Sequence, residues 1–180
     1  MIAIGLKPVI VIILLFLALS SDLKTCKIKN IVTYSFMLTG MIINYAEEGT
    51  GGLVFSLQGI ALPAAGLLIL YAMKAIGAGD IKLLSAVGSV MGPRFTLYSG
   101  ACSFIFGGFI ALGIVFKRKN GAKRFKYLFQ YIRSCFLTMN LLRYEDSEDR
   151  QGEGKFRFSI AIASGTAVVF IIRRLGLIGI

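Results

Sequence analysis

Several separate apolar runs, each bounded by charged or glycine-rich residues, constrain this chain more than any other feature. The run at residues 2–20 is already long enough to cross the hydrocarbon core of a bilayer, which needs about 20 residues of helix. Apolar residues make up 56% of the 180-residue chain, and the mean hydropathy is +0.77. Because a backbone in lipid must satisfy its own hydrogen bonds, these runs predict membrane-spanning helices.

We expect an all-α, polytopic membrane protein that forms one domain over residues 1–180. The apolar runs predict about six transmembrane helices, because each can span most of a bilayer. The run at 80–92 is short, since roughly 12 residues make about 18 Å of helix against a hydrocarbon core of about 30 Å. Either the bilayer is thinner there, or Asp80 lies below the cytoplasmic surface inside the protein. The six expected spans are 2–20, 31–45, 53–76, 80–92, 95–116 and 158–172.

The net charge of +11 is concentrated in loops between the apolar runs. Lysines follow the first run at residues 24–29, and the loop at 117–157 begins with a strongly basic segment. Membrane proteins carry their excess Lys and Arg on the cytoplasmic side, so both loops are expected there, with the N-terminus outside. Arg173 and Arg174 then fall on the external side, against this rule. Basic loops of this kind bind anionic lipid, so we expect the bilayer, and not nucleic acid, as a partner.

The residue inventory excludes several kinds of site. The chain has no His, which removes Ser-His-Asp and Cys-His catalysis and most zinc sites. Its three cysteines, Cys26, Cys102 and Cys135, are far apart and form no metal-binding or disulfide pattern. We therefore expect no metal and no cofactor.

Two acids, Asp22 and Asp80, border apolar runs on the expected cytoplasmic side. Asp22 follows the first run, and Asp80 opens the fourth. Two carboxylates that meet can share one proton, since both cannot ionise cheaply at close range. One carboxylate then activates a water while the other donates a hydrogen bond to a scissile carbonyl. Their spacing in the sequence does not show that the two acids meet.

Asp80 directly follows the break Gly77-Ala78-Gly79. An ionised carboxylate in hydrocarbon costs about 2.5–3.5 kcal/mol on insertion scales, so such an acid is usually functional. The glycines let the backbone leave helical geometry and approach another chain closely. The same pattern fits an ordinary turn in which Asp80 caps the next helix. Lys82 either extends towards the lipid headgroups or orients the acid.

These motifs resemble those of a known family. Residues 77–83, Gly-Ala-Gly-Asp-Ile-Lys-Leu, resemble the GxGDxKL motif of type IV prepilin peptidases, which are membrane aspartic proteases of the GxGD class. Asp22 with the later triplet Ile-Lys-Asn at 28–30 is similar to the family's first catalytic acid and its Ile-Pro-Asn-like triplet, with Lys29 in place of the usual Pro. Residues 155–165 resemble the family's closing segment.

The resemblance implies a peptidase that cleaves a short basic leader from prepilin-like precursors, on the cytoplasmic side of the substrate's apolar helix. It implies an Asp22/Asp80 dyad that activates water. The compact size is similar to the branch that processes Flp (tight-adherence) pilins and to archaeal preflagellin peptidases. The cysteine-bearing insertion of methylating members is missing, so we expect cleavage without N-methylation. The residues expected to support the motif or bind substrate are Gly77, Gly79, Lys82 and Asn30.

Two other functional classes fit the same features. A small transporter or channel would use Asp80, beside a broken helix, as an ion or proton site. A non-catalytic membrane scaffold for an assembly machine is the third possibility. Transporters are often built from internal repeats, and no convincing repeat is found here. A neighbouring gene for a short pilin-like protein with a basic leader would favour the peptidase.

Overall fold

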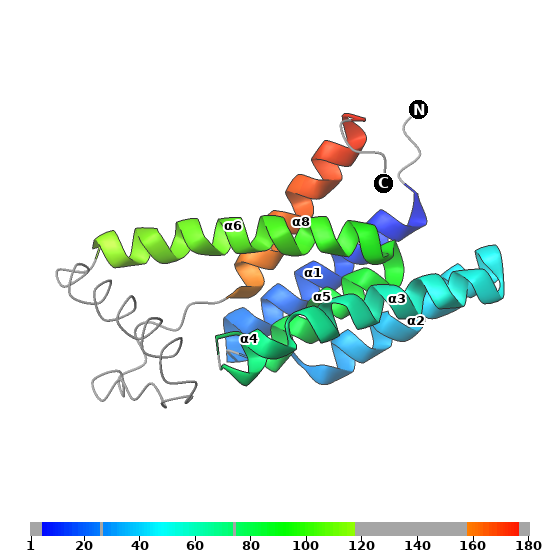
Figure 1. Cartoon of the computed structure of the whole chain (residues 1–180), viewed down its shortest axis with the longest axis horizontal. Helices are drawn as coiled ribbons and strands as arrows, with labels where there is room; N and C mark the ends of the chain where they lie inside the picture. Colours follow the sequence, from blue (N-terminus) through cyan, green and yellow to red (C-terminus); the bar gives the residue numbers. More distant parts are fainter. Residues whose placement is uncertain (1–4, 26, 74, 118–157, 177–180) are drawn as a thin grey trace. The chain divides into compact units, whose positions relative to one another are not determined.

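The computed structural model describes residues 5–25, 27–73, 75–117 and 158–176 (Figure 1). Within these ranges the chain forms helices and no strand, which confirms the predicted all-α class. The helices are α1 (Leu6–Thr25), α2 (Asn30–Glu48), α3 (Thr50–Gly66), α4 (Leu68–Ala72), α5 (Ala78–Met91), α6 (Pro93–Lys117) and α8 (Phe158–Arg174).

Contacts divide the chain into two compact units. Residues 1–107 and 157–180 form the first, and residues 108–156 form the second. Helix α6 continues from the first unit into the second, in which only its C-terminal end at 108–117 is described. The loop expected at 117–157 therefore lies almost wholly outside the described residues. All contacts discussed below belong to the first unit.

Among the described helices, Leu6–Thr25 and Pro93–Gly113 are long and apolar enough to cross a bilayer. Large apolar side chains point outward from both helices, among them Phe16 and Ile105, and Ile42 does the same on α2. Soluble proteins rarely expose so much apolar surface, whereas lipid-facing helices do. The number of six spans is not confirmed, because α3, α5 and α8 have 17, 14 and 17 residues. A spanning helix needs about 20 residues.

The connection between α2 and α3 is a single residue, Gly49. Its φ of 61° is one that residues with side chains rarely adopt, and its N–H donates to the Tyr45 carbonyl at 2.8 Å. The span expected at 53–76 is divided into α3 and α4. Pro63 lies within α3, which ends at Gly66, a residue with low helix propensity. Hydropathy alone does not show this interruption, but Pro63 within the run predicts a kink close to it.

Helix α5 is the central element of the first unit, where it contacts α1, α2, α3 and α8. Figure 1 shows α5 beside α1 and α3. Every residue of α5 from Leu83 to Met91 is buried. A helix that is apolar or small-sided on all faces is typical of a core position. Its 14 residues make about 21 Å of helix, which is shorter than a hydrocarbon core of about 30 Å, and Asp80 in its first turn is partly buried.

Glycines allow α3 and α5 to pack backbone against backbone. A Cβ atom on Gly59 would overlap the carbonyl oxygen of Gly88, and one on Gly88 would overlap that of Gly59. Membrane helices use small residues in this way, since close approach increases van der Waals contact without a hydrophobic driving force. The pair fixes the distance between the middle of α3 and the C-terminal part of α5.

A buried hydrogen-bond network joins α2, α3 and α5. The Asn44 amide Nδ2 donates to Ser56 Oγ and to the Ser89 carbonyl, both at 2.8 Å. Ser89 Oγ in turn donates to the Met37 carbonyl at 2.6 Å. Such bonds between helices keep buried polar groups satisfied where water cannot reach them. They set the rotation of α5 relative to α2 and α3.

Helix α8 packs against the first half of α6. A Cβ atom on Gly165 would clash with the Ser103 backbone, so the two helices approach closely there. The rings of Phe95 and Phe170 also meet, with centroids 4.8 Å apart and planes tilted by 48°. Together with the contacts of α8 with α1 and α5, this packing places the start of α8 next to the end of α1.

Candidate active site

Asp80 is the third residue of α5, and the start of that helix determines its position. Gly77 caps the helix with an extended backbone, φ −77° and ψ 146°, and its carbonyl accepts the Asp80 N–H at 3.1 Å. The Asp80 carboxyl accepts a hydrogen bond from the backbone N–H of Gly77. This side-chain contact to the cap residue is half of a capping box. Asp80 is therefore held at the positive end of the α5 dipole.

Asp22 lies inside α1, three residues before its end at Thr25, although the sequence suggested a position after the span. The helix continues past the apolar run through several polar residues, whose hydroxyls bond back to the preceding turn. For example, Ser20 Oγ donates to the Phe16 carbonyl at 2.7 Å. The Asp22 side chain is buried, and its charge acts electrostatically on the Asp80 carboxyl. The structure thus brings the two acids near each other, where α1 ends and α5 begins.

Ser159 is a third member of this site. It is the second residue of α8, and its Oγ donates a hydrogen bond of 2.5 Å to Asp22 Oδ2. Only 1% of the Ser159 surface and 8% of the Asp22 surface is exposed. A buried carboxylate without donors is costly, so this bond stabilises Asp22 in its position.

Lys82 and Asn30, from the two separate sequence motifs, contact each other. Lys82 Nζ donates to Asn30 Oδ1 at 3.0 Å and lies 5.1 Å from the centroid of the Tyr34 ring. The ring position allows a cation–π attraction. Asn30 is the first residue of α2, so the contact ties the start of α2 to the first turn of α5. Lys82 thus braces the backbone near the acids, through Asn30 and Tyr34.

The two glycines of the Gly-x-Gly break have different surroundings. A Cβ atom on Gly77 would lie 3.2 Å from Asp80 Oδ2, so a side chain at this position would crowd the acid. A Cβ atom on Gly79 would lie 3.4 Å from Cβ of Ile28, which precedes Asn30. The break is therefore packed against the segment that links α1 and α2.

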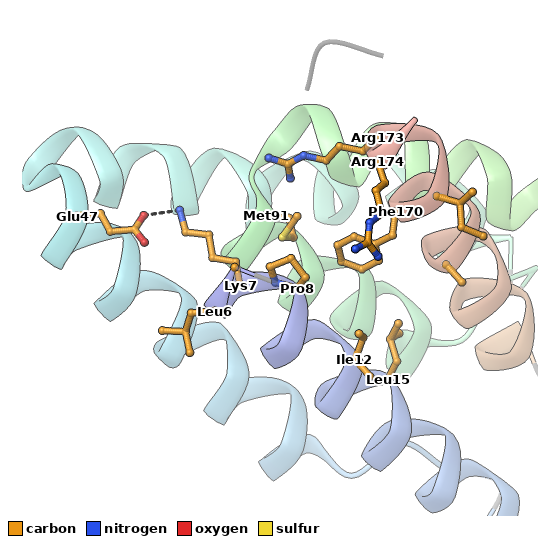
Figure 2. A pocket seen from close by; sticks show the side chains of 13 residues that line it. Leu6, Lys7, Pro8, Ile12, Leu15, Glu47, Met91, Phe170, Arg173 and Arg174 are labelled. Atoms are coloured by element: carbon orange, nitrogen blue, oxygen red, sulfur yellow. Dashed lines mark ion pairs between the residues drawn. The ribbon is translucent and has the colours of Figure 1, made fainter. Parts of the chain in front are cut away.

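A cavity of about 730 Å³ lies at the opposite end of the first unit (Figure 2). It is lined by the N-terminal half of α1 and the C-terminal ends of α5 and α8, including Met91 and Phe170. At its edge Lys7 Nζ forms an ion pair with Glu47, with a nitrogen–oxygen distance of 2.5 Å. Asp22, Asp80 and Ser159 lie at the other ends of these three helices. The cavity is therefore separate from the acids.

The described part of the chain contains no group of three His, Cys, Asp or Glu side chains placed to hold a metal ion. The groups that the site brings together are the carboxyl groups of Asp22 and Asp80 and the Ser159 hydroxyl. Sequence reasoning missed Ser159 and Tyr34 as members of the site. The sequence contained one indication of Ser159, because this residue begins the last expected span on the side where Asp22 and Asp80 were also expected. The sequence also contained an indication of Tyr34, since this residue follows Asn30 by about one helical turn and so lies on the same face of the helix.

A model of the type IV leader peptidase family matches residues 9–112, more than half of the chain. The matched range contains Asp22, Asp80, Asn30 and Lys82 and ends before α8. No curated protein and no solved structure matches the chain. The family match includes both halves of the acid pair that the helices bring together, and on this basis the chain belongs to the type IV leader peptidase family.

Proposed function

We propose that this protein is a membrane aspartic endopeptidase that removes the short basic leader from type IV prepilin-like precursors. The supporting observation is that the end of α1 and the start of α5 bring Asp22 near enough to Asp80 for its charge to act on the Asp80 carboxyl. Both acids fall in the range matched by the leader peptidase family. Two carboxylates that share a site can share one proton, as aspartic proteases require.

In the proposed reaction, the ionised carboxylate accepts a proton from a water molecule as the water oxygen bonds to the scissile carbonyl carbon. The protonated carboxyl donates a hydrogen bond to the carbonyl oxygen and stabilises the charge that develops there. The carbon–nitrogen bond of the tetrahedral intermediate then breaks, and the leaving nitrogen takes a proton from the dyad. One peptide bond and one water become a new carboxyl terminus and a new amine.

The segment before Asp80 supports a peptide substrate. Gly77 is exposed and extended, directly beside the acid. A peptide can approach this exposed residue, and its scissile bond would then lie near the carboxyl group. The proposed substrate carries a basic leader and an apolar helix, so its cleavage site would lie at the membrane boundary. A Flp-type pilin is the proposed substrate, because the order of the motifs resembles that of the branch that processes such pilins.

The direct test is co-expression with a short pilin-like precursor, followed by mass measurement of the precursor's new N-terminus. The expected result is loss of the leader in membranes containing this chain and an intact precursor without it. The alternative function is a transporter or channel with Asp80 as its ion or proton site. Ion flux in proteoliposomes, together with a precursor that stays intact beside folded protein, would favour that alternative.

The proposed orientation can be tested by thiol labelling in intact cells. Lys24 and Thr50 are both exposed, at the end of α1 and at the start of α3. In a chain whose cysteines are replaced by Ser, Thr50→Cys should react with an impermeant reagent from outside. Lys24→Cys should react only after the cells are opened, because the Lys-rich segment belongs on the cytoplasmic side. Labelling of Lys24→Cys in intact cells would place the acids on the external face.

A further inference from the structure

The contact between Ser159 and Asp22 joins parts of the chain that are 137 residues apart. Asp22 lies within the range matched by the family, 9–112, whereas Ser159 lies in α8, beyond that range. Among the described residues, the Ser159 hydroxyl donates a side-chain hydrogen bond to Oδ2 of Asp22, and the bond is 2.5 Å long. Helix α8 therefore contributes directly to the surroundings of one acid of the pair.

The position of Asp22 explains why such a donor is needed. Asp22 is in the last turn of α1, where unsatisfied carbonyl groups and the negative end of the dipole disfavour a carboxylate. Ser159 is in the first turn of α8, where backbone N–H groups and the positive end of the dipole favour one. The hydroxyl thus holds the Asp22 carboxylate beside the N-terminal end of α8, where the positive end of the helix dipole favours a negative charge.

We propose that Ser159 is a positioning residue that fixes the Asp22 carboxylate for its work with Asp80. This inference rests on the proposed function. The Ser159 hydroxyl binds Oδ2 of Asp22 and limits rotation of the carboxylate, so that its remaining lone pairs face the partner acid and the attacking water. Helix α8 then completes the catalytic arrangement that α1 and α5 begin.

The test compares cleavage by Ser159→Ala, Ser159→Cys and Ser159→Thr chains with the unmodified chain. Hydrogen bonds to charged groups are strong enough that losing this one should lower kcat about 10- to 100-fold. KM should change little, because the hydroxyl touches Asp22 and not the substrate. Ser159→Thr keeps a hydroxyl and should recover most of the rate. Ser159→Cys, with a weaker donor, should be intermediate, and this grading distinguishes positioning from loss of packing.

Ser164→Ala is the matched control, because it removes a hydroxyl from the same helix. Among the described residues, Ser164 Oγ bonds within α8, to the Ile160 carbonyl at 2.9 Å, so its removal should leave kcat unchanged. Equal rates for Ser159→Ala and the unmodified chain would overturn the inference. An equal loss in Ser164→Ala would overturn it too, since the effect would then belong to α8 as a whole.

A second measurement separates this inference from the proposed function. Thermal unfolding in detergent is compared for Ser159→Ala, Asp22→Ala and the double variant. If the two side chains interact as proposed, Ser159→Ala lowers the unfolding midpoint much less in the Asp22→Ala chain than in the unmodified one. Strictly additive shifts would overturn the inference even if cleavage is confirmed. If the shifts in the unfolding midpoint are not additive but no precursor is cleaved, the proposed function is wrong, while the contact between Ser159 and Asp22 is supported.

Discussion

Replacing Asp80 with Asn is expected to lower cleavage of a pilin-like precursor by about 100- to 10,000-fold, the contribution typical of a positioned acid or base. Asn has nearly the same size as Asp, but it can neither accept a proton from water nor give one to the leaving nitrogen. Asp22→Asn should have a comparable effect. Because the two acids act as one unit, the double variant should be little worse than either single variant.

The measurement is the rate of leader removal in membranes, with the amount of folded protein determined for each variant. Glu48→Gln is the matched control, since Glu48 is an exposed acid at the C-terminal end of α2, away from the pair. This variant should cleave at the unmodified rate. Full activity of the Asp22→Asn chain would leave Asp80 without its proposed partner. Full activity of both Asn variants would exclude dyad catalysis.

Adding one methyl group to Gly88 is expected to destabilise the fold by about 1–3 kcal/mol or more, as overpacking of a tight core does. The new Cβ atom of Gly88→Ala would overlap the Gly59 carbonyl oxygen. That atom belongs to a helix backbone, so α3 and α5 must separate to accommodate it. Since α5 also positions Asp80, cleavage should fall with stability. The midpoint of thermal unfolding in detergent measures the effect.

Gly100→Ala provides the comparison for this experiment. Gly100 is also in a helix, α6, but a Cβ atom there would meet nothing within 4 Å. In a helix interior Ala is favoured over Gly by roughly 0.8–1.0 kcal/mol, so this variant should be as stable as the unmodified chain or slightly more stable. Equal midpoints for Gly88→Ala and Gly100→Ala would show that α3 and α5 do not pack as closely as the structure has them.

Local sequence properties were sufficient to predict most helices. Apolar runs indicated α1, α2, α6 and α8, because burial in lipid or protein requires a continuous apolar surface and a self-bonded backbone. The start of α5 was predicted within two residues, because the run was expected to begin at Asp80, whereas the helix begins at Ala78 with Gly77 as its cap. Boundaries were less predictable. The helix α1 extends through Asp22 to Thr25, and the third run is divided into α3 and α4.

The helical class, the two candidate acids and the motifs around them could be predicted from the sequence, since these depend on residue type and on spacing within a few turns. The side-chain contacts of the acids and of the motif residues depend on the tertiary structure. The bond between Ser159 and Asp22 spans 137 residues, and that between Lys82 and Asn30 spans 52. Such contacts depend on how far each helix is rotated and how deeply it packs. The glycine contacts and the Asn44 network set both quantities for α5, and neither follows from hydrophobic pattern alone.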